Sequence, residues 1–369
     1  MAEPMQLALS LASAAQWVVP PNPAVGCVIV TPTGEVIGVG QTQRTGGPHA
    51  EVMALRDAAS KGHAVRGATA YVTLEPCSHH GRTGPCSGAL IAAGIAKVVA
   101  SLADPNPLVA GHGFAKLRAA GIDVEIGPGA SESRELNIGF FSRMVRKSPW
   151  VRLKVAASLD GITALENGTS QWITSPPARA DGHAWRARSG AMLTGVGTVL
   201  EDNPRLDVRL VDTLRQPPLV VVDSHLQTPP DARIFEAERP VWFYAAARDD
   251  AKAAALEAHG ATVTCLPNAQ GKVDLAALLK DLAVREVNEL HVEAGHKLNG
   301  SLLREGLVDE FVIYLAPKFI GSGLSMASHP HAGGPLTALT DALPLEFRSV
   351  ELIGPDLRIV ARVTENDVF

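Results

Sequence analysis

The sequence is poor in cysteine and in positive charge, and it has no long hydrophobic run. Its 369 residues include four cysteines, too few for the disulfide framework of a secreted protein, so we expect a reducing, cytoplasmic setting. No apolar run is long enough to span a bilayer, and the N-terminus lacks the features of a secretory signal. The net charge is -5, with no run of Lys or Arg, which argues against nucleic acid or a membrane surface as the main partner. A small phosphorylated ligand, which needs only a few local donors, stays compatible with this charge.

What the chain does contain is an alternation of strand-like and helix-like segments along its whole length. Apolar residues make up 46% of it and charged residues 19%, as in globular proteins, and its length suits two domain cores. The dipeptide Ser148-Pro149 interrupts the helical pattern, and an apolar strand begins at Val151. We therefore expect an α/β protein with one domain at 1–147 and a second at 148–369.

Hydrophobic periodicity predicts the individual elements of both domains. In the first domain we expect helices at 4–16, 49–61, 86–93, 114–120 and 131–146, and strands at 24–30, 35–39, 68–74, 98–101 and 122–125. In the second domain we expect strands at 151–157, 191–194, 219–223, 241–244, 262–265, 290–293 and 311–315, and helices at 177–188, 249–259, 275–282 and 301–306. The second pattern is typical of a largely parallel sheet.

One histidine, one glutamate and two cysteines in the first domain form the most informative pattern of the chain. One imidazole and two thiolates, from His49, Cys77 and Cys86, make a ligand set that suits zinc and leaves a fourth position for water. Glu51 lies two residues beyond the histidine, where it is well placed to move protons. A His-x-Glu followed by a Pro-Cys pair is the signature of zinc deaminases. We therefore expect a catalytic zinc ion, with Glu51 as the catalytic acid–base.

The spacing of the two cysteines is unusual. Eight residues, Ser78 to Pro85, separate them, whereas nucleoside and nucleobase deaminases usually have two. The insert Ser-His-His-Gly-Arg-Thr-Gly-Pro resembles the deaminase half of the bifunctional riboflavin-biosynthesis deaminase–reductase family, which usually has proline at the position of Gly84. Glycine should loosen this loop without removing a ligand. A purely structural zinc, with His79 or His80 as the fourth ligand, stays open as an alternative.

The second domain has no complete dinucleotide-binding fingerprint. Gly195-Val-Gly197 follows a strand but lacks the third glycine, so an ordinary tight turn explains it equally well. The segment 293–301 is a better phosphate-binding candidate, because it leaves a strand, turns on Gly295 and enters a helix. Its backbone N–H groups could bind a pyrophosphate, although a plain strand-to-helix turn fits the same residues.

Longer motifs in both halves resemble those of the same bifunctional family, over about residues 4 to 365. The first half contains Asn22-Pro23-x-Val25-Gly26 and Asp104-Pro-Asn106-Pro107-x-Val109-x-Gly111-x-Gly113. The second half contains Lys154-Val-Ala-Ala-Ser158-Leu-Asp160-Gly161, Ser170-Gln171-Trp172-Ile173-Thr174, Asp202-Asn203-Pro204-Arg-Leu206-Asp-Val-Arg209, Val292-Glu293-Ala294-Gly295 and Ala316-Pro317-Lys318.

The resemblance implies a fold and a set of binding residues. The first half should be a cytidine-deaminase-like three-layer α/β/α domain, and the second a dihydrofolate-reductase-like α/β domain. The implied substrate-binding residues are Asn22, His79, Ser170, Arg186, Leu206, Arg209 and Glu293. The implied cofactor-binding residues are Ala156, Trp172, Thr198, Asp202, Ser224, Gly295, His296, Lys297, Leu298, Asn299, Gly300 and Ser301. Arg186 and Arg209 suit a ribose 5-phosphate, because a guanidinium group binds phosphate in a fork.

The implied function is riboflavin biosynthesis in two steps. Zinc-activated water deaminates 2,5-diamino-6-(5-phosphoribosylamino)pyrimidin-4-one to the uracil, and NADPH then reduces the ribosyl group to ribityl. The reduction needs an acid near the sugar, for which Lys154, Asp202 and Glu293 are candidates. A preference for NADPH over NADH is expected, with Lys297 and Ser224 near the extra phosphate. We also expect a homo-oligomer, either a dimer or a tetramer.

Two other interpretations stay open at this point. A deaminase could be fused to a dihydrofolate-reductase-like module that acts on another pterin or nucleotide. Alternatively, the chain could be a zinc-bearing binding or regulatory protein without catalysis. The presence of Glu51 argues against the latter, because a structural zinc has no need of a proton shuttle.

Overall fold

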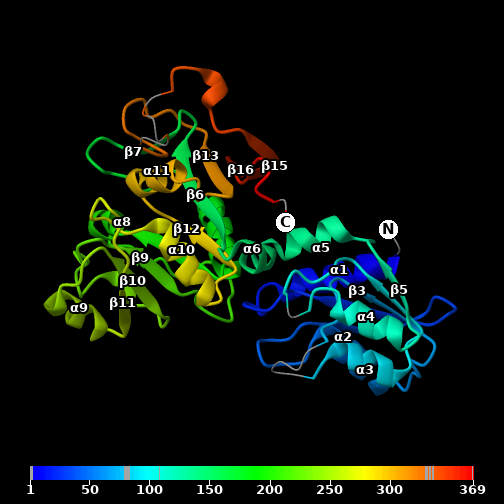
Figure 1. Ribbon diagram of the computed structural model, residues 1–369. Coiled ribbons are helices and arrows are strands. Elements are labelled where there is room, and N and C mark those ends of the chain that lie inside the picture. The colour runs from blue at the N-terminus through cyan, green and yellow to red at the C-terminus, as the bar shows by residue number, and fades with distance from the viewer. Residues whose placement is uncertain are drawn as a thin grey trace. The chain divides into compact units, whose positions relative to one another are not determined.

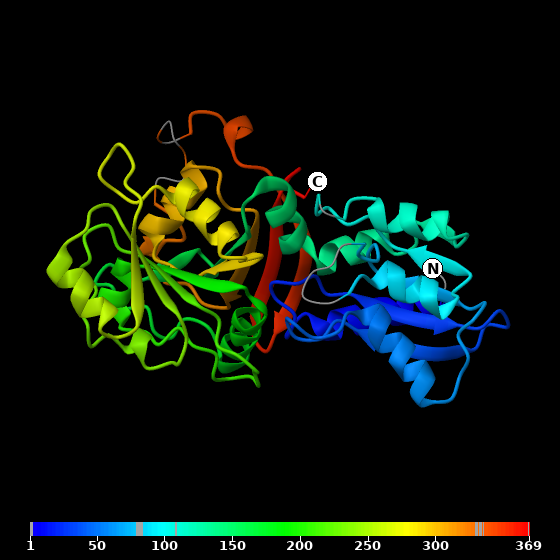
Figure 2. The same cartoon turned by 60° about the horizontal axis from the view of Figure 1, so that its bottom comes forward.

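The chain divides into two compact units. The structure is a computed structural model that describes residues 3–78, 84–107, 109–328, 331, 334, 336–367 and 369. One unit is Met1–Lys147 together with Phe369, and the other is Ser148–Val368. Figures 1 and 2 show the helices and strands of each unit from two directions. Among the described residues, no helix combines the length and the apolar character that a membrane crossing requires.

The first unit is built on a five-stranded sheet in the order β2-β1-β3-β4-β5. Its strands are β1 (Gly26–Val30), β2 (Val36–Gln41), β3 (Thr69–Val72), β4 (Lys97–Ala100) and β5 (Asp123–Ile126). Strand β1 pairs antiparallel with both β2 and β3, whereas β3, β4 and β5 are parallel. The predicted strands of this domain are therefore confirmed, within a few residues at each end.

Helices cover both faces of this sheet. They are α1 (Glu3–Ala15), α2 (Ala50–Ser60), α3 (Cys86–Ala93), α4 (His112–Ala119), α5 (Ala130–Leu136) and α6 (Ile138–Arg146). Because side chains alternate along a strand, Val28 and Val30 of β1 pack with α1, while Cys27 and Ile29 pack with α2, α3 and α4. The expected three-layer α/β/α arrangement is confirmed (Figure 1).

The start of α2 lies close to the sheet. A Cβ atom on Gly40 of β2 would lie 2.4 Å from the carbonyl oxygen of Ala50, so glycine lets the start of α2 approach the sheet closely.

The prediction of one continuous helix over 131–146 is wrong, because α5 and α6 meet at Asn137. The side-chain amide of Asn137 donates to the carbonyl of Ala24 at 2.9 Å and accepts from its N–H at 2.7 Å. This contact between distant parts of the chain accompanies the division of the predicted helix into two.

The second unit contains a nine-stranded sheet in the order β11-β10-β9-β8-β12-β6-β13-β16-β15, and a short β14-β7 pair. Its strands are β6 (Trp150–Ser158), β7 (Ile162–Ala164), β8 (Ala191–Gly195), β9 (Leu219–Val222), β10 (Val241–Ala245), β11 (Ala261–Cys265), β12 (Glu289–Val292), β13 (Glu310–Ala316), β14 (Leu324–Ser325), β15 (Leu345–Ile353) and β16 (Asp356–Val363). All neighbours from β11 to β13 are parallel, which confirms the predicted sheet type.

Helices also cover both faces of the larger sheet. They are α7 (Pro176–Arg188), α8 (Val196–Asp202), α9 (Asp250–Glu257), α10 (Leu275–Val284) and α11 (His296–Arg304). Helices α10 and α11 bury Leu278, Leu282 and Leu302 against one face. On the other face α8 and α9 bury Val199 and Leu256. The sheet edge that follows the parallel strands is thus free to carry functional loops.

Candidate active sites

The three residues expected to bind zinc lie together in the first unit. Nδ1 of His49 is 3.6 Å from Sγ of Cys77 and 3.3 Å from Sγ of Cys86. These three ligand atoms lie within 4.8 Å of one another, the only such cluster found among the described residues. The nitrogen and sulfur ligands of a tetrahedral zinc ion, at ordinary bond lengths, lie roughly 3.5 Å apart. The donor set and its spacing therefore fit a zinc ion.

Two helix starts carry this cluster. His49 is the N-cap of α2, so Glu51 stands in the first turn of that helix. Cys86 is the first residue of α3, which ends at Gly94 as predicted, and its backbone N–H donates to Sγ of Cys77 at 3.3 Å. Backbone N–H groups at a helix start favour negative charge, so they help to hold a thiolate.

The protonation of the cluster suits proton transfer. Burial raises the pKa of Glu51 to about 6, and the charge of Cys77 adds to this effect. A group with a pKa near neutrality can both accept and return a proton. A side-chain hydrogen bond with Cys86 lowers the pKa of Cys77 to about 4, while the same contact raises the pKa of Cys86. Metal binding therefore has to displace a thiol proton, which makes zinc affinity dependent on pH.

Glu75, which sequence reasoning missed, fixes the segment that leads into Cys77. Its side chain is 4% exposed, and its carboxylate accepts hydrogen bonds at 2.9–3.1 Å from four backbone N–H groups. The four donors are Asp104, Gly111, Gly113 and Phe114. The motif at 104–113 thus supplies backbone donors that hold the zinc loop. A glutamate directly before Pro-Cys, at the end of an apolar strand, was the signal that could have revealed this role.

The two substrate-binding residues expected in the first unit stay predictions. Asn22 is partly buried in the turn after α1, where its N–H donates to the carbonyl of Val19 at 2.9 Å. His79 lies outside the described residues, and so does His80, the other candidate for a fourth ligand of a structural zinc. Gly84 is described, and a Cβ atom there would meet nothing within 4 Å.

In the second unit, expected cofactor-binding residues follow three neighbouring strands. Strands β9, β8 and β12 are adjacent and parallel, so the residues after them share one edge of the sheet. Ser224 follows β9, Thr198 lies in α8 after β8, and Gly295 is the N-cap of α11 after β12. A Cβ atom on Gly295 would lie 3.7 Å from Oγ1 of Thr198, so the two helix starts are close. Nucleotides bind at such edges in open α/β sheets.

The run from Gly295 to Ser301 divides into two parts. The prediction that the helix begins at Ser301 is wrong, since α11 begins at His296. Asn299 and Gly300 are buried in packing, with Nδ2 of Asn299 donating to the carbonyl of Met326 at 2.9 Å. His296, Lys297 and Leu298 form the first turn after Gly295, and the side chain of Lys297 is exposed. This first turn is the part best placed to meet a pyrophosphate.

Other expected positions of this unit lie on separate elements. Trp172 is 61% exposed, and the Arg179 guanidinium lies 4.6 Å from its ring centroid. Asp202, at the end of α8, accepts a hydrogen bond from Oγ of Ser170 at 3.0 Å. Ala156 is partly buried on β6. The exposed indole of Trp172 offers a stacking surface to a planar ring.

Glu293 is the centre of a charged group. Arg186 donates to both of its carboxylate oxygens, at 2.5 and 2.8 Å, and Nζ of Lys154 lies 3.5 Å away. Burial raises the pKa of Glu293, but the charges of Arg186 and Lys154 outweigh this effect and hold the pKa well below its usual value. A carboxylate that stays ionised cannot donate a proton near neutral pH. Glu293 is therefore unsuited to be the acid of the reduction. Lys154, another of the expected acids, lies next to it.

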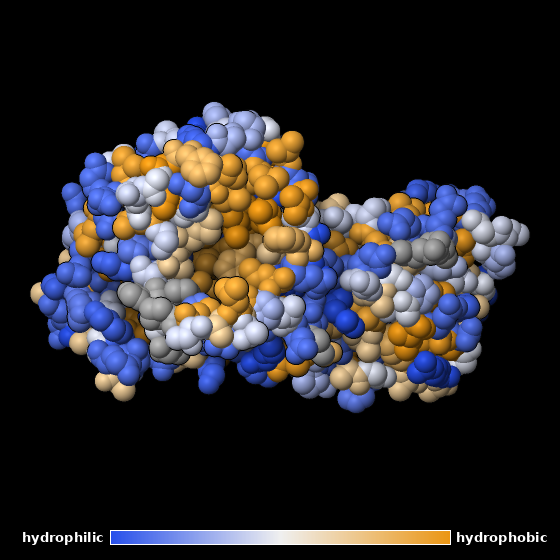
Figure 3. Space-filling model, turned by 90° about the horizontal axis from the view of Figure 1, so that it is seen from above, coloured by the Kyte–Doolittle hydropathy of each residue, from blue (hydrophilic) through white to orange (hydrophobic). Residues whose placement is uncertain are grey.

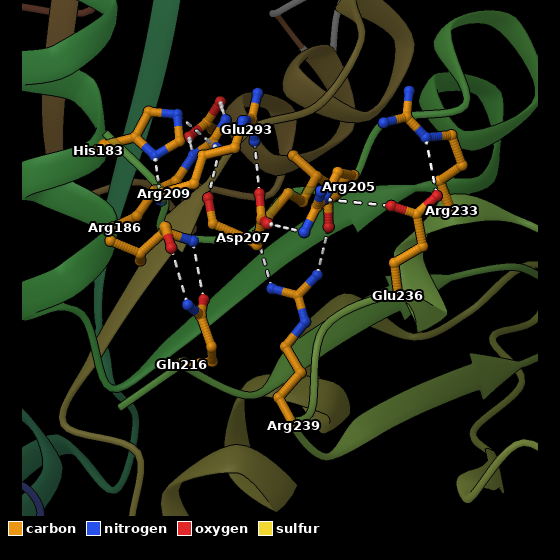
Figure 4. A network of polar contacts seen from close by, with 12 residues as sticks. His183, Arg186, Arg205, Asp207, Arg209, Gln216, Arg233, Glu236, Arg239 and Glu293 are labelled. Carbon is orange, nitrogen blue, oxygen red and sulfur yellow. Dashed lines mark hydrogen bonds and ion pairs between the residues drawn. The ribbon is translucent and has the colours of Figure 1, made fainter. Parts of the chain in front are cut away.

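The two arginines expected at the phosphate differ in their contacts (Figure 4). Arg186 is 13% exposed, and its remaining nitrogen donates to the carbonyl of Asp207 at 2.9 Å. Arg209 is 43% exposed and pairs with the carboxylate of Asp207, which sequence reasoning missed. Leu206, also expected at the substrate, is buried in the same loop. The guanidinium of Arg209 is therefore open to an anion, whereas that of Arg186 is committed to Glu293.

Comparisons with known proteins agree with this geometry. The family model described as the cytidine and deoxycytidylate deaminase zinc-binding region matches residues 2–102, and that of the RibD C-terminal domain matches residues 149–359. The riboflavin biosynthesis protein RibD of Escherichia coli (strain K12) is 46% identical over 366 residues, covering 96% of each chain. The protein of the same name from Aquifex aeolicus is 41% identical, again over 96% of each chain.

Solved structures of relatives share the fold of the whole chain. The RibD structure from Acinetobacter baumannii superposes with a TM-score of 0.87 at 38% identity, and covers 98% of both chains. A Thermotoga maritima structure, titled diaminohydroxyphosphoribosylaminopyrimidine deaminase/5-amino-6-(5-phosphoribosylamino)uracil reductase, has a TM-score of 0.86 at 33% identity, covering 98% of this chain and 97% of that one. The chain therefore belongs to the RibD family of bifunctional deaminase–reductases of riboflavin biosynthesis.

Proposed function

We propose that the unit Met1–Lys147 is a zinc-dependent pyrimidine deaminase domain and the unit Ser148–Val368 an NADPH-dependent reductase domain. The proposed substrate is 2,5-diamino-6-(5-phosphoribosylamino)pyrimidin-4-one, whose 2-amino group is replaced before its ribosyl group is reduced. The observation that carries the proposal is the cluster of His49, Cys77 and Cys86 beside the buried Glu51. The name of the Thermotoga maritima relative, a pyrimidine deaminase and uracil reductase, supports both the substrate and the order of the two steps.

In the first step Glu51 is the group that moves protons. A zinc ion held by His49, Cys77 and Cys86 would lower the pKa of a water molecule toward neutrality. Glu51, with a pKa raised to about 6, takes a proton from that water as it attacks the ring carbon that carries the amino group. Glu51 delivers this proton to the ring nitrogen, and then moves the remaining proton of the added hydroxyl group to the departing ammonia. Burial keeps bulk water away from the carboxylate during these transfers.

In the second step Lys154 is the proposed acid. NADPH, when bound, supplies a hydride to C1 of the ribosyl group, most simply in its ring-opened imine form. The nitrogen attached to C1 then needs a proton. Lys154 is partly exposed and lies 3.5 Å from the ionised Glu293, which holds its ammonium group in place. Asp202 accepts from Ser170, and it fits better as a polar contact at the cofactor edge.

Residues of the sheet edge are proposed to bind NADPH. The first turn of α11, from Gly295 to Leu298, and the adjacent Thr198 suit the pyrophosphate. Trp172 offers a stacking face. The exposed Lys297 could pair with the extra phosphate that distinguishes NADPH from NADH. A kcat/KM for NADPH well above that for NADH is the expected result, and equal values would count against this assignment.

A homo-oligomer, built through β15, is also proposed. This edge strand puts Leu345, Phe347, Val350 and Leu352 on one face, because a bulge before Ser349 restores the alternation. These four side chains are 41–74% exposed. Hydrophobic side chains also gather on the face of this unit that Figure 3 shows. Exposed apolar edge strands invite pairing with another chain. A second copy of the same face would bury them in a symmetric contact.

Light scattering of purified protein tests the oligomer. Phe347→Glu puts a charge in the middle of the apolar face and should lower the mass toward that of the monomer. Glu346→Lys, on the opposite face of β15, is the control and should leave the mass unchanged. A monomeric unsubstituted protein, or an unchanged mass in Phe347→Glu, would remove this part of the proposal.

A coupled assay tests the main proposal. Zinc-loaded protein is supplied with the diaminopyrimidine ribotide, and ammonia release and NADPH oxidation are followed together. We expect ammonia to be released even when NADPH is absent. When NADPH is present, we expect its oxidation to begin only after the ribotide has been deaminated. A matched panel of pterins and dihydrofolate tests whether the second unit acts on another substrate. NADPH oxidation with a pterin, and none with the ribotide, would overturn the proposed reduction.

A further inference from the structure

The loop between α8 and β9 has an unusual backbone. Asn203 has a φ of 40° and Leu206 a φ of 50°, both in the left-handed region that residues other than glycine rarely adopt. Such a conformation persists only where neighbouring groups hold it. The loop also carries the charged residues Arg205, Asp207 and Arg209, and Arg209 is one of the two arginines expected at the substrate's phosphate (Figure 4). What holds the backbone therefore also decides where these charges lie.

Arg239, which precedes β10, holds the strained part of the loop. Its Nη1 donates to the carbonyl of Leu206 and its Nη2 to the carbonyl of Arg205, both at 2.6 Å. The planar guanidinium thus donates hydrogen bonds to two successive carbonyl groups, at and before the left-handed residue Leu206. A lysine has the same charge but lacks this fork.

Side chains from other elements hold the rest of the loop. Gln216 accepts from the N–H of Val208 and donates to its carbonyl, both at 2.8 Å. The other two contacts are those of Arg186 with the carbonyl of Asp207, at 2.9 Å, and of His183 with the N–H of Arg209, at 3.1 Å. Each residue from Arg205 to Arg209 thus has a backbone group held by a side chain, and Figure 4 shows Arg239 below Asp207.

The charges around the loop do not balance. The carboxylate of Asp207 is 3% exposed and pairs with both Arg205 and Arg209, which are 36% and 43% exposed. Arg239 makes no ion pair in the part of the chain that the structure describes, and burial lowers its pKa to about 10, so it stays charged at neutral pH. Glu236, which is 43% exposed, pairs with Arg205 and with Arg233. Two carboxylates therefore lie among four guanidinium groups, those of Arg205, Arg209, Arg233 and Arg239. Such an excess favours a dianion at the exposed side.

We propose that Arg239 is a positioning residue for phosphate recognition in the reductase site, holding the loop that presents Arg205 and Arg209 to the substrate's phosphate. This inference rests on the proposed function, because it needs a phosphorylated substrate in the second unit. Arg239 does not touch the reacting atoms. It acts through the backbone of Arg205 and Leu206, so its effect should appear only with substrates that carry the phosphate.

Steady-state reduction of two substrates tests the proposal. One is the deaminated uracil ribotide, and the other is the corresponding riboside, which lacks the phosphate. Arg239→Met should raise KM for the ribotide roughly tenfold, with little change in kcat, and should change kcat/KM for the riboside less than about twofold. Arg239→Lys should restore only part of the ribotide KM, because it keeps the charge without the fork. Arg248→Met, an exposed arginine outside this loop, is the control and should change neither substrate.

The outcomes separate this proposal from the one on which it rests. An equal loss with both substrates in Arg239→Met would show a merely structural role, and no loss with either would remove the role altogether. Full recovery of the ribotide KM in Arg239→Lys would show that the positive charge is sufficient and that the two forked hydrogen bonds are not needed. If Arg239→Met does not fold, Arg239→Lys decides by the same ribotide–riboside comparison. If Arg209→Ala fails to distinguish the two substrates, the proposed phosphate site itself is wrong.

Discussion

Replacing Glu75 by glutamine would test how the zinc loop is held. The change is nearly isosteric, but an amide has one acceptor oxygen where the carboxylate has two. Glu75 accepts four backbone N–H groups, two on each oxygen, so the amide's NH2 group must face two N–H donors. A hydrogen bond to a charged group contributes about 1.5–3 kcal/mol, so the loss of two predicts a destabilisation of about 3–6 kcal/mol. Burial at 4% exposure leaves little solvent to compensate.

Hydrogen exchange of single amides measures this effect directly. The N–H groups of Asp104, Gly111, Gly113 and Phe114 should lose about 10²- to 10⁴-fold of their protection in Glu75→Gln, the free energy above expressed as a ratio. Zinc affinity should fall as well, because the segment before Cys77 is released. Glu125→Gln is the control, since Glu125 is half-exposed and its one ion pair among the described residues is with Lys97 on the surface. Unchanged protection and zinc affinity in Glu75→Gln would refute the reasoning.

Three shorter predictions concern other groups. Cys86→Ser should lose stoichiometric zinc by elemental analysis, and full zinc retention would remove Cys86 from the ligand set. Lys154→Met should lower kcat for reduction by about 10²- to 10⁴-fold while ammonia release persists, whereas normal reduction would exclude Lys154 as the acid. Burial, and then the charge of Arg186, lowers the pKa of His183 to about 4, so folded His183 is neutral and the unfolded chain binds the extra proton below about pH 6.5. Stability from His183 should therefore fall between pH 6.5 and 4, and His183→Gln should unfold with a flatter dependence on pH over that window.

The zinc site could be predicted because its signal is local. Ligand type, a histidine two residues before a glutamate, and a proline before each cysteine are all visible in the sequence. Helix boundaries near the site were also predictable, since Gly94 ends α3 in the left-handed conformation. The strand periodicity of the parallel sheet was equally plain, because buried strands are continuous apolar runs.

What sequence reasoning missed depends on long-range contacts. Glu75 and Arg239 act through backbone groups of segments far along the chain, and no spacing rule marks such partners. The division at Asn137 depends on a bond to Ala24, more than a hundred residues away. The strand β15 was not predicted because its apolar face is exposed, and a bulge interrupts its alternation. Arg186 stays a predicted substrate-binding residue, but its contact with Glu293, more than a hundred residues away, could not be read from the sequence.

Glu51→Gln is the sharpest test of whether two independent sites perform the two successive reactions. The substitution keeps the shape of the side chain and removes the titrating carboxylate. We expect ammonia release to collapse in folded, zinc-loaded Glu51→Gln, while NADPH oxidation with the already deaminated uracil ribotide stays at the level of the unsubstituted protein. Loss of both activities in that protein, with its zinc content and fold intact, would exclude two independent sites and require one shared site.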